Sequence, residues 1–437
     1  MWSGDQIRNS QKGSFRRGEG YGLKLNKMNF EKKMRDYASL TAKLGVNVKS
    51  DRYVYLNCDI EAAEFGRLVE EECYKLGAKD VIMNYNDQRA ARIRLDNADI
   101  SMFEKLPEWK CEQRNYYARE GCVCIHIIAE DPEIFAGASG EKLKASALAA
   151  HKGYKEFYDI MDKGGLRWTI VAYPCEAWAT KVFPDDPPKK AVEKLWAAIF
   201  RTVRVTTGDT VKKWEKHDRV LKRRAKWLND QNFAFLRYRN SLGTDFTLGL
   251  ADGHIWKGGS EKSSDGVDYF PNMPTEEIFT MPDCRKAEGT VFSALPLSYQ
   301  GEMIDKFSLT FKDGKVVSCT AEKGLHALER LLDTDEGSRS LGEAALIPAS
   351  SPIATSGILF YNTLFDENAS CHLALGECYP DTMKGGELLT EDELLAKGGN
   401  RSANHVDFMI GTKDLEVVGI KHDGTEVRIM EDGEFTI

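Results

Sequence analysis

The hydrophobic pattern changes character near residue 230, and this change constrains the fold more than any other feature of the chain. Before it, four short apolar runs are typical of β-strands: YVYLNCDI, DVIMNYN, CVCIHIIAE and LRWTIVAYP. Longer stretches with helical spacing separate them, such as AAEFGRLVEEECYKLG, which ends at Gly77. Strands that alternate with helices predict a parallel, doubly wound α/β layer.

Strands and tight turns dominate after residue 230. FAFLRYRN and FTLGLADG flank SLGTD as a hairpin-like pair, and Asp313–Gly314 is a strong hairpin turn. The C-terminus reads as a meander that turns at HDG and EDG. Two stretches with helical spacing, 324–333 and 367–376, interrupt these strands. The second half therefore predicts an α+β domain with an antiparallel sheet.

A chain of 437 residues is too long for one ordinary core. We expect a flexible basic arm at 1–29, an α/β N-terminal domain at 30–215 and an α+β C-terminal domain at 216–437. The charged run KKWEKHDRVLKRR, at 212–224, is interpreted as a solvated helical linker beside the boundary.

Composition excludes several classes of protein. A formal net charge of −8 argues against a nucleic-acid binder, and no apolar run approaches the roughly 20 residues that span a bilayer. The N-terminus lacks an apolar signal-peptide core, and the ten cysteines contain no CxxC pair, so we expect a cytoplasmic protein with reduced thiols. GASGEKLKASA lacks the glycine spacing of a nucleotide site and is interpreted as a helix start capped by Ser139.

His405 and Asp407 stand two residues apart in the strand-like segment NHVDFMIG. Because side chains alternate across a strand, these two point to one face while Val406 and Phe408 point to the other. A polar His-x-Asp pair opposite an apolar pair suits a metal-binding sheet surface. An edge strand facing water fits the same pattern.

Three further segments carry candidate ligands. His372 follows Asp366 and Asn368, either of which can cap a helix, and is expected in the second turn of that helix. Glu276 and Glu277 are adjacent between two prolines, and Glu343 is followed at once by apolar residues. A buried carboxylate needs a partner, and a divalent cation is an effective one.

Together Glu277, Glu343, His372, His405 and Asp407 offer oxygen and nitrogen ligands without thiolates. Such a set suits two hydrolytic divalent ions, such as Zn, Co or Mn, better than a structural zinc. An acid bridging the ions would hold them about 3.5–4 Å apart. The sequence does not choose among the three metals.

Four segments resemble the thermophilic-type metalloaminopeptidases, the aminopeptidase T and AmpS family. They are WKGGSEKSSDGVDYFPNMPTEEIFT, SLGEAALIP, FYNTLFDENASCHLALGECY and NRSANHVDFMIG, and the resemblance extends over residues 29–437. It implies that the five candidate ligands bind two metals and that Tyr379 is an active-site tyrosine. It also implies a homodimer, a cleft between the two domains, and peptide substrates with a free N-terminus.

The expected reaction is the release of N-terminal amino acids by a hydroxide held between two divalent ions. Glu276 is the candidate general base, with a merely supporting or surface acid as the alternative, and Tyr379 is the candidate donor to the oxyanion. Two other readings stay open: another two-metal amide or ester hydrolase, and a non-enzymatic binding protein with a vestigial site.

Overall fold

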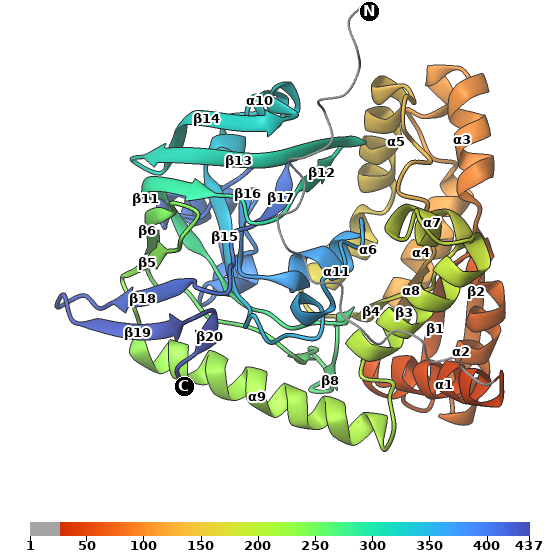
Figure 1. The fold of residues 1–437 in the computed structure, drawn as a ribbon. Coiled ribbons are helices and arrows are strands. Elements are labelled where there is room, and N and C mark those ends of the chain that lie inside the picture. Colours follow the sequence, from red (N-terminus) through yellow and green to blue (C-terminus); the bar gives the residue numbers. More distant parts are fainter. Residues whose placement is uncertain (1–26) are drawn as a thin grey trace, which may run out of the picture.

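A computed structural model describes residues 27–437. The expected basic arm lies outside these residues except for its last three positions, which begin helix α1. Two lobes are visible in Figure 1, a helix-rich N-terminal lobe and a C-terminal lobe built mainly of antiparallel strands. Within the described part of the chain, no helix is long and apolar enough to cross a membrane.

The N-terminal lobe is built on a five-stranded parallel sheet in the order β2-β1-β3-β4-β9. Its strands are β1 Tyr53–Asp59, β2 Asp80–Asn86, β3 Val123–Ile128, β4 Arg167–Ala172 and, from much later in the chain, β9 Asn272–Met273. Its helices are α1 Lys27–Leu40, α2 Ala63–Lys75, α3 Gln88–Asn97, α4 Glu108–Arg119, α5 Gly140–Gly153, α6 Lys155–Asp162, α7 Glu176–Val182 and α8 Pro188–Thr202.

Alternate residues of these strands enter two different cores, as a doubly wound sheet requires. Val54 and Leu56 of β1 pack into the larger core with α1, α2 and α8, whereas Tyr55 packs into a smaller core with α4 and α6. The predicted parallel α/β architecture is confirmed. The predicted cap of α5 is confirmed as well, since the side chain of Ser139 accepts a hydrogen bond from the backbone N–H of Lys142.

Two antiparallel sheets form most of the C-terminal lobe. A four-stranded sheet has the order β10-β15-β16-β17, with β10 Ile278–Thr280, β15 Leu341–Leu346, β16 His372–Gly376 and β17 His405–Met409. A nine-stranded sheet has the order β12-β13-β11-β6-β5-β18-β19-β20, with β14 paired to β13. Its strands are β5 Phe235–Arg239, β6 Asp245–Leu250, β11 Pro282–Phe292, β12 Leu297–Tyr299, β13 Glu302–Lys312, β14 Lys315–Lys323, β18 Glu416–Ile420, β19 Glu426–Glu431 and β20 Glu434–Phe435.

Smaller elements complete this lobe: β7 Glu261–Lys262 paired with β8 Asp268–Tyr269, α10 Leu325–Leu332, α11 Thr363–Asp366 and α12 Glu391–Ala396. The predicted hairpins β5–β6 and β13–β14 and the turns at HDG and EDG are confirmed.

The helix expected over 367–376 is wrong, because only 367–369 form a 3-10 turn and His372 begins β16. Neither expected cap acts as one: the carboxylate of Asp366 instead accepts hydrogen bonds from the backbone N–H groups of Phe360 and Asn362.

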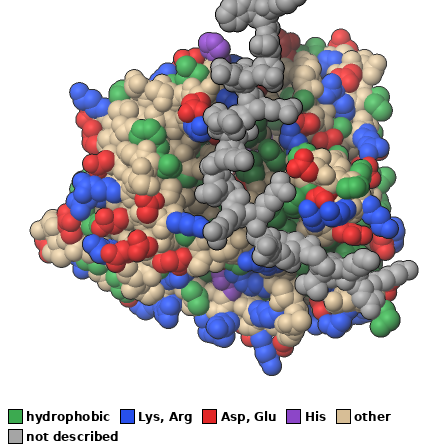
Figure 2. Space-filling view, in the orientation of Figure 1, with side chains coloured by type: hydrophobic (Ala, Val, Ile, Leu, Met, Phe, Trp, Pro, Cys, Tyr) green, Lys and Arg blue, Asp and Glu red, His purple; other side chains and the backbone are tan. Residues whose placement is uncertain are grey.

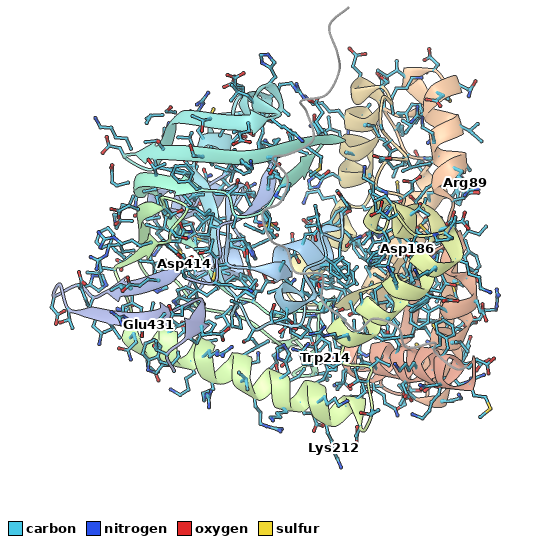
Figure 3. The ribbon with its side chains drawn as sticks, viewed as in Figure 1. Arg89, Asp186, Lys212, Trp214, Asp414 and Glu431 are labelled. Atoms are coloured by element: carbon cyan, nitrogen blue, oxygen red, sulfur yellow. The ribbon has the colours of Figure 1, made fainter. Side chains whose placement is uncertain are left out.

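Helix α9, Thr210–Gln231, runs along both lobes (Figure 1) and contains the expected boundary at 215/216, which stays a prediction. The run 212–224 was expected to be solvated, but α9 is amphipathic. Trp214 and Leu221 are buried and Lys212 is exposed, and Figure 3 shows the Lys212 side chain pointing away from the molecule. On the face drawn in Figure 2, acidic and basic side chains are interspersed.

Candidate metal centre

The four-stranded sheet brings the five candidate ligands together. Glu277 immediately precedes β10, Glu343 lies in β15, His372 begins β16, and His405 and Asp407 lie in β17. The register pairs Glu343 and Asp407 with the same residue of β16, Ala374, from either side. Strands β15, β16 and β17 therefore place Glu343, His372, His405 and Asp407 over one region of the sheet.

Glu343 is shared between two groups of potential ligands. Its Oε1 lies 3.6 Å from Nε2 of His372, and its Oε2 lies 3.4 Å from Nε2 of His405. Glu277 completes the first group, with its Oε2 3.4 Å from Nε2 of His372. Asp407 completes the second, with its Oδ1 3.4 Å from Nε2 of His405. In each group the ligand atoms lie within 4.8 Å of one another.

A close approach of two strands aims Glu343 at the centre. The pairing of β15 with β16 shifts its register between Leu341 and Glu343, and such bulges re-aim neighbouring side chains. Gly342 stands at this shift, where a Cβ atom would lie 2.1 Å from the carbonyl oxygen of Glu377. Only glycine fits there without moving the backbone, which explains the Gly-Glu pair in SLGEAALI.

Both histidines are oriented through their Nδ1 atoms. Nδ1 of His372 lies 3.2 Å from the carbonyl oxygen of Ser370, and Nδ1 of His405 lies 2.8 Å from that of Glu377. A carbonyl oxygen only accepts, so each Nδ1 carries a proton and donates it. Each Nε2 then faces the carboxylates, which is the arrangement of a metal-binding imidazole.

The electrostatics of the cluster fit a cation. Burial, followed by the charges of Glu343 and Asp407, raises the pKa of Glu277 to about 8 despite the opposing effect of His372. Burial alone would lower the pKa of His405, but the facing carboxylates of Asp407 and Glu343 outweigh it and raise the pKa to about 11. Oδ1 of Asp407 is also buried without a hydrogen-bond partner. Divalent cations would satisfy that oxygen and offset the repulsion among the carboxylates.

Tyr379 follows β16 and lies against the second group. Its ring centroid is 4.6 Å from that of His405. The Tyr379 side chain is 43% exposed overall, but loss of water around its hydroxyl and the charges of Glu343 and Asp407 raise the pKa of that hydroxyl well above the usual value. The hydroxyl therefore keeps its proton and can donate it to a hydrogen bond.

The structure does not bring Glu276 to this cluster. Its carboxylate is buried and pairs with Arg204, whose Nη2 lies 2.8 Å from Oε1. Burial raises the pKa of Glu276 to about 7, and the groups that oppose this shift are Arg204 and Arg224 rather than any candidate ligand. The two adjacent carboxylates therefore have different partners: that of Glu277 faces His372, and that of Glu276 faces Arg204.

Sequence reasoning missed Glu367. Its carboxyl is partly buried, and its pKa is raised well above the usual value by burial and by the charges of Glu277 and Asp407. It therefore lies near the centre although neither ligand group includes it. The sequence gives no periodic or motif signal for it. Glu367 sits in an irregular turn, and only the fold brings that turn beside β17.

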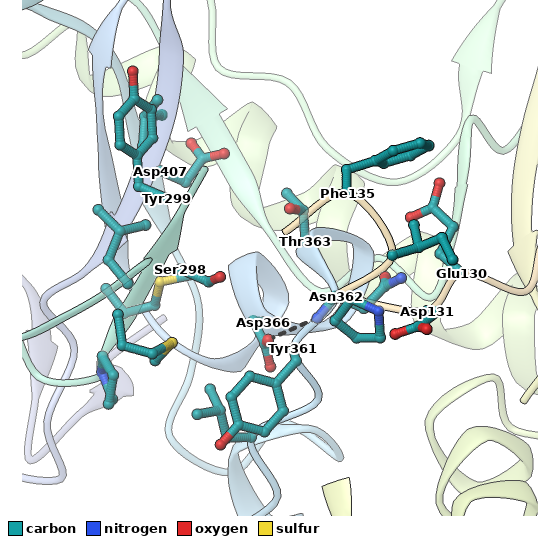
Figure 4. A pocket seen from close by; sticks show the side chains of 18 of the residues that line it. Glu130, Asp131, Phe135, Ser298, Tyr299, Tyr361, Asn362, Thr363, Asp366 and Asp407 are labelled. Atoms are coloured by element: carbon teal, nitrogen blue, oxygen red, sulfur yellow. Dashed lines mark hydrogen bonds between the residues drawn. The ribbon is translucent and has the colours of Figure 1, made fainter. Parts of the chain in front are cut away.

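A pocket of about 440 Å³ opens beside the cluster, between the two lobes. Glu130, Asp131 and Phe135 from the loop after β3 form one wall, and Tyr299 and Asp407 lie on the opposite side (Figure 4). Among the described residues that line the pocket, none is Lys or Arg.

Comparisons with known proteins agree with this geometry. Residues 30–435 match the family model described as thermophilic metalloprotease (M29). The chain is 39% identical to aminopeptidase AmpS of Bacillus subtilis over 93% of its length and 99% of that protein. It is 41% identical to aminopeptidase PepS of Streptococcus thermophilus, over 94% and 99%.

Among solved structures, wild-type AmpT from Thermus thermophilus matches with a TM-score of 0.87 and 38% identity, over 93% of this chain and 100% of that one. A 2,5-dihydroxypyridine dioxygenase from Pseudomonas putida shares the fold alone, with a TM-score of 0.51 and 13% identity. The family match and these relatives, together with the ligand cluster, identify the class as a metal-dependent hydrolase. The chain belongs to the M29 family of thermophilic metalloproteases, and the prediction of a metalloaminopeptidase is confirmed.

Proposed function

We propose that the protein removes single amino acids from the free N-terminus of peptides with two divalent cations. One observation carries the proposal: the two oxygens of Glu343 face two different histidines, His372 and His405. A carboxylate placed in this way can bridge two ions. Glu277 and His372 would complete the first site, and His405 and Asp407 the second.

The chemistry divides between the cations and the chain. When bound, two such ions supply an acidified water molecule and polarise the scissile carbonyl. The hydroxyl of Tyr379 donates a hydrogen bond to the oxygen on which negative charge develops. The thiolate-free ligand set accepts Zn, Co or Mn, so the metal is a matter for measurement.

Recognition of a free amino group is supported by the pocket. Glu130 and Asp131 are among the residues that line it, and none of the described lining residues is Lys or Arg. A negative potential in a cleft attracts the ammonium group of a peptide N-terminus. A blocked N-terminus loses this attraction.

We expect aminoacyl anilides with a free amino group to be hydrolysed at least about 10²-fold faster, in kcat/KM, than their N-acetyl derivatives. Release of the aniline is measured with both substrates at equal enzyme and metal concentrations. Equal rates on both would point to the alternative, a general amide or ester hydrolase. Binding of two cations without hydrolysis of either substrate would point to a vestigial site.

Glu367 replaces Glu276 as our candidate for proton transfer, because its carboxyl interacts with the cluster and that of Glu276 does not. Beyond burial, the charges of Glu277 and Asp407 raise the pKa of this carboxyl, and bound cations would offset those charges. The ionised carboxylate would then accept a proton from water and return it to the leaving amine. The amide of Asn368 donates a hydrogen bond to Oε1 of Glu367 at 3.2 Å and orients this carboxyl.

Replacing Glu367 with Gln is expected to lower kcat by at least about 10²-fold, because general acid–base groups contribute about 10²–10⁴. The variant should retain both cations. Glu261→Gln is the matched control, since Glu261 is a partly buried carboxyl bonded to Tyr269 and is in neither ligand group. Loss of a cation from the Glu367→Gln protein would make Glu367 a ligand instead.

We also propose a homodimer in the cytoplasm. All ten cysteines are free, which suits a reducing compartment. The homodimer rests on the family resemblance, and analytical ultracentrifugation of the purified protein at micromolar concentration tests it. A sedimentation coefficient typical of a monomer would contradict the proposed homodimer.

A further inference from the structure

A buried polar network holds the segment that carries Glu277. Thr275, Glu276 and Glu277 belong to no strand. They connect β9, which pairs in the parallel sheet of the N-terminal lobe, to β10, which pairs in the four-stranded sheet. At this crossing no ladder of strand hydrogen bonds fixes the backbone, so Glu277 depends on other contacts for its position.

Arg204, just after α8, and His217, in α9, contact this segment on one side. Nη2 of Arg204 donates to Oε2 of Glu276 at 2.9 Å and to Nδ1 of His217 at 3.0 Å. Nε2 of His217 donates to the carbonyl oxygen of Thr275 at 2.8 Å. One guanidinium and one imidazole therefore hold both the side chain of Glu276 and the carbonyl before it.

Arg204 is itself held in an uncommon conformation. Its φ angle is +60°, in the left-handed region that a residue with a side chain adopts at an energetic cost. Its guanidinium lies 5.4 Å from the ring of Trp214, and the indole N–H of Trp214 donates to the carbonyl oxygen of Val203 at 2.8 Å. Figure 3 shows Trp214 near the end of α9 that adjoins the N-terminal lobe.

Asn368 supplies the contact from the other side. It is fully buried, and its Oδ1 accepts a hydrogen bond from the backbone N–H of Glu276 at 2.7 Å. Its Nδ2 donates to the carbonyl oxygen of Leu364 and to Glu367. The carbonyl of Thr275 and the N–H and side chain of Glu276 are thus all anchored immediately before Glu277.

We infer that Arg204, His217, Glu276 and Asn368 are positioning residues that fix Glu277 for the first cation, the one shared by Glu277, Glu343 and His372. None of them touches the reacting atoms. Partners that orient a ligand typically contribute roughly tenfold to a hundredfold to metal affinity. The second cation, held by Glu343, His405 and Asp407, does not depend on this network. The inference rests on the proposed function in that it takes Glu277 as a metal ligand.

This role differs measurably from that of a general base. A general base at Glu276 would lower kcat at saturating metal and leave metal affinity unchanged. A positioning residue weakens one cation and leaves kcat at saturating metal nearly intact. The two roles therefore separate in a titration of metal followed by a measurement of activity.

The experiment compares the full-length wild type with Glu276→Gln, Arg204→Met and Arg204→Lys. Each protein is stripped of metal, and Zn²⁺ and, separately, Mn²⁺ binding is followed by calorimetry. We expect wild type to bind two ions. In Glu276→Gln and Arg204→Met one dissociation constant should rise roughly tenfold to a hundredfold while the other stays within about threefold. Arg204→Lys, which keeps the charge, should recover part of the loss.

Arg167→Met is the matched control. Arg167 is buried in the same lobe and pairs with Asp265 at 2.6 Å, and Thr275, Glu276 and Glu277 are not among its hydrogen-bond or ion-pair partners. It should bind both ions as wild type does. Thermal unfolding of the metal-free proteins identifies any variant that fails to fold, and the other of Glu276→Gln and Arg204→Met then carries the test. Unchanged affinities for both ions in a folded Glu276→Gln or Arg204→Met protein overturn the inference, whereas a wild type that binds no ion overturns the proposed function instead.

Discussion

Replacing Glu343 with Ala is expected to release both cations and to lower kcat/KM by at least about 10³-fold. Its two oxygens face His372 and His405 at 3.6 and 3.4 Å, so one substitution removes a ligand from both sites. Metal ions supply several kcal/mol of charge stabilisation, and roughly 1.4 kcal/mol corresponds to a tenfold change in rate. Metal content after dialysis against a fixed free-metal concentration measures the first effect, and anilide hydrolysis measures the second.

Single-site variants provide the comparison for Glu343. Glu277 belongs only to the first ligand group and Asp407 only to the second. Glu277→Ala and Asp407→Ala should therefore each lose one ion and keep the other. A folded Glu343→Ala protein that retains one ion at wild-type affinity would show that Glu343 is not shared.

Replacing Tyr379 with Phe is expected to lower kcat by about 10²–10³-fold, the usual effect of removing one donor to an oxyanion. KM and metal content should change little, because the ring remains and both groups of His, Asp and Glu ligands stay complete. The raised pKa of Tyr379 keeps this hydroxyl protonated over the pH range in which the enzyme is assayed. Steady-state kinetics at saturating metal give kcat and KM separately.

Tyr299→Phe is the control for this substitution. Tyr299 also lines the pocket, and its hydroxyl accepts a hydrogen bond from Gln300 at 3.2 Å. It should retain kcat within about threefold. A Tyr379→Phe enzyme with the same kcat as Tyr299→Phe would remove Tyr379 from catalysis.

Local patterns predicted the parts of the fold that depend on near neighbours along the chain. The alternation in NHVDFMIG correctly indicated that His405 and Asp407 share a face. In the structure Nε2 of His405 lies 3.4 Å from Oδ1 of Asp407. The turn at Asp313–Gly314 likewise joins β13 and β14 as expected. In both cases the deciding information lies within a few residues.

The wrong helix at 367–376 arises because a short apolar run fits both the helical and the strand periodicity. HLALG is buried along its whole length, so it lacks the alternation of a half-buried strand. Its neighbours Asp366 and Asn368 resemble caps, but the first accepts backbone hydrogen bonds of a loop and the second joins two distant segments. The strand assignment of His372 depends on β15 and β17, which no local window contains.

Contacts between distant residues also explain why the sequence pointed to Glu276 for proton transfer and missed Glu367. Adjacency made Glu276 a candidate for the chemistry, yet its partner Arg204 lies 72 residues earlier in the chain. Glu367 is brought to the cluster by an irregular turn. Sequence identified which residue types were present, and the fold decided which of them face the centre.

Metal removal and restoration, measured on the wild-type enzyme, is the most direct test of a two-cation aminopeptidase. The protein is dialysed against a chelator, its metal content is determined, and hydrolysis of a free-amino aminoacyl anilide is measured before and after Zn²⁺, Co²⁺ or Mn²⁺ is returned. We expect activity to fall at least about 10³-fold in the stripped protein and to return as two ions per chain are restored. Full activity in a protein proven free of metal would contradict the proposal.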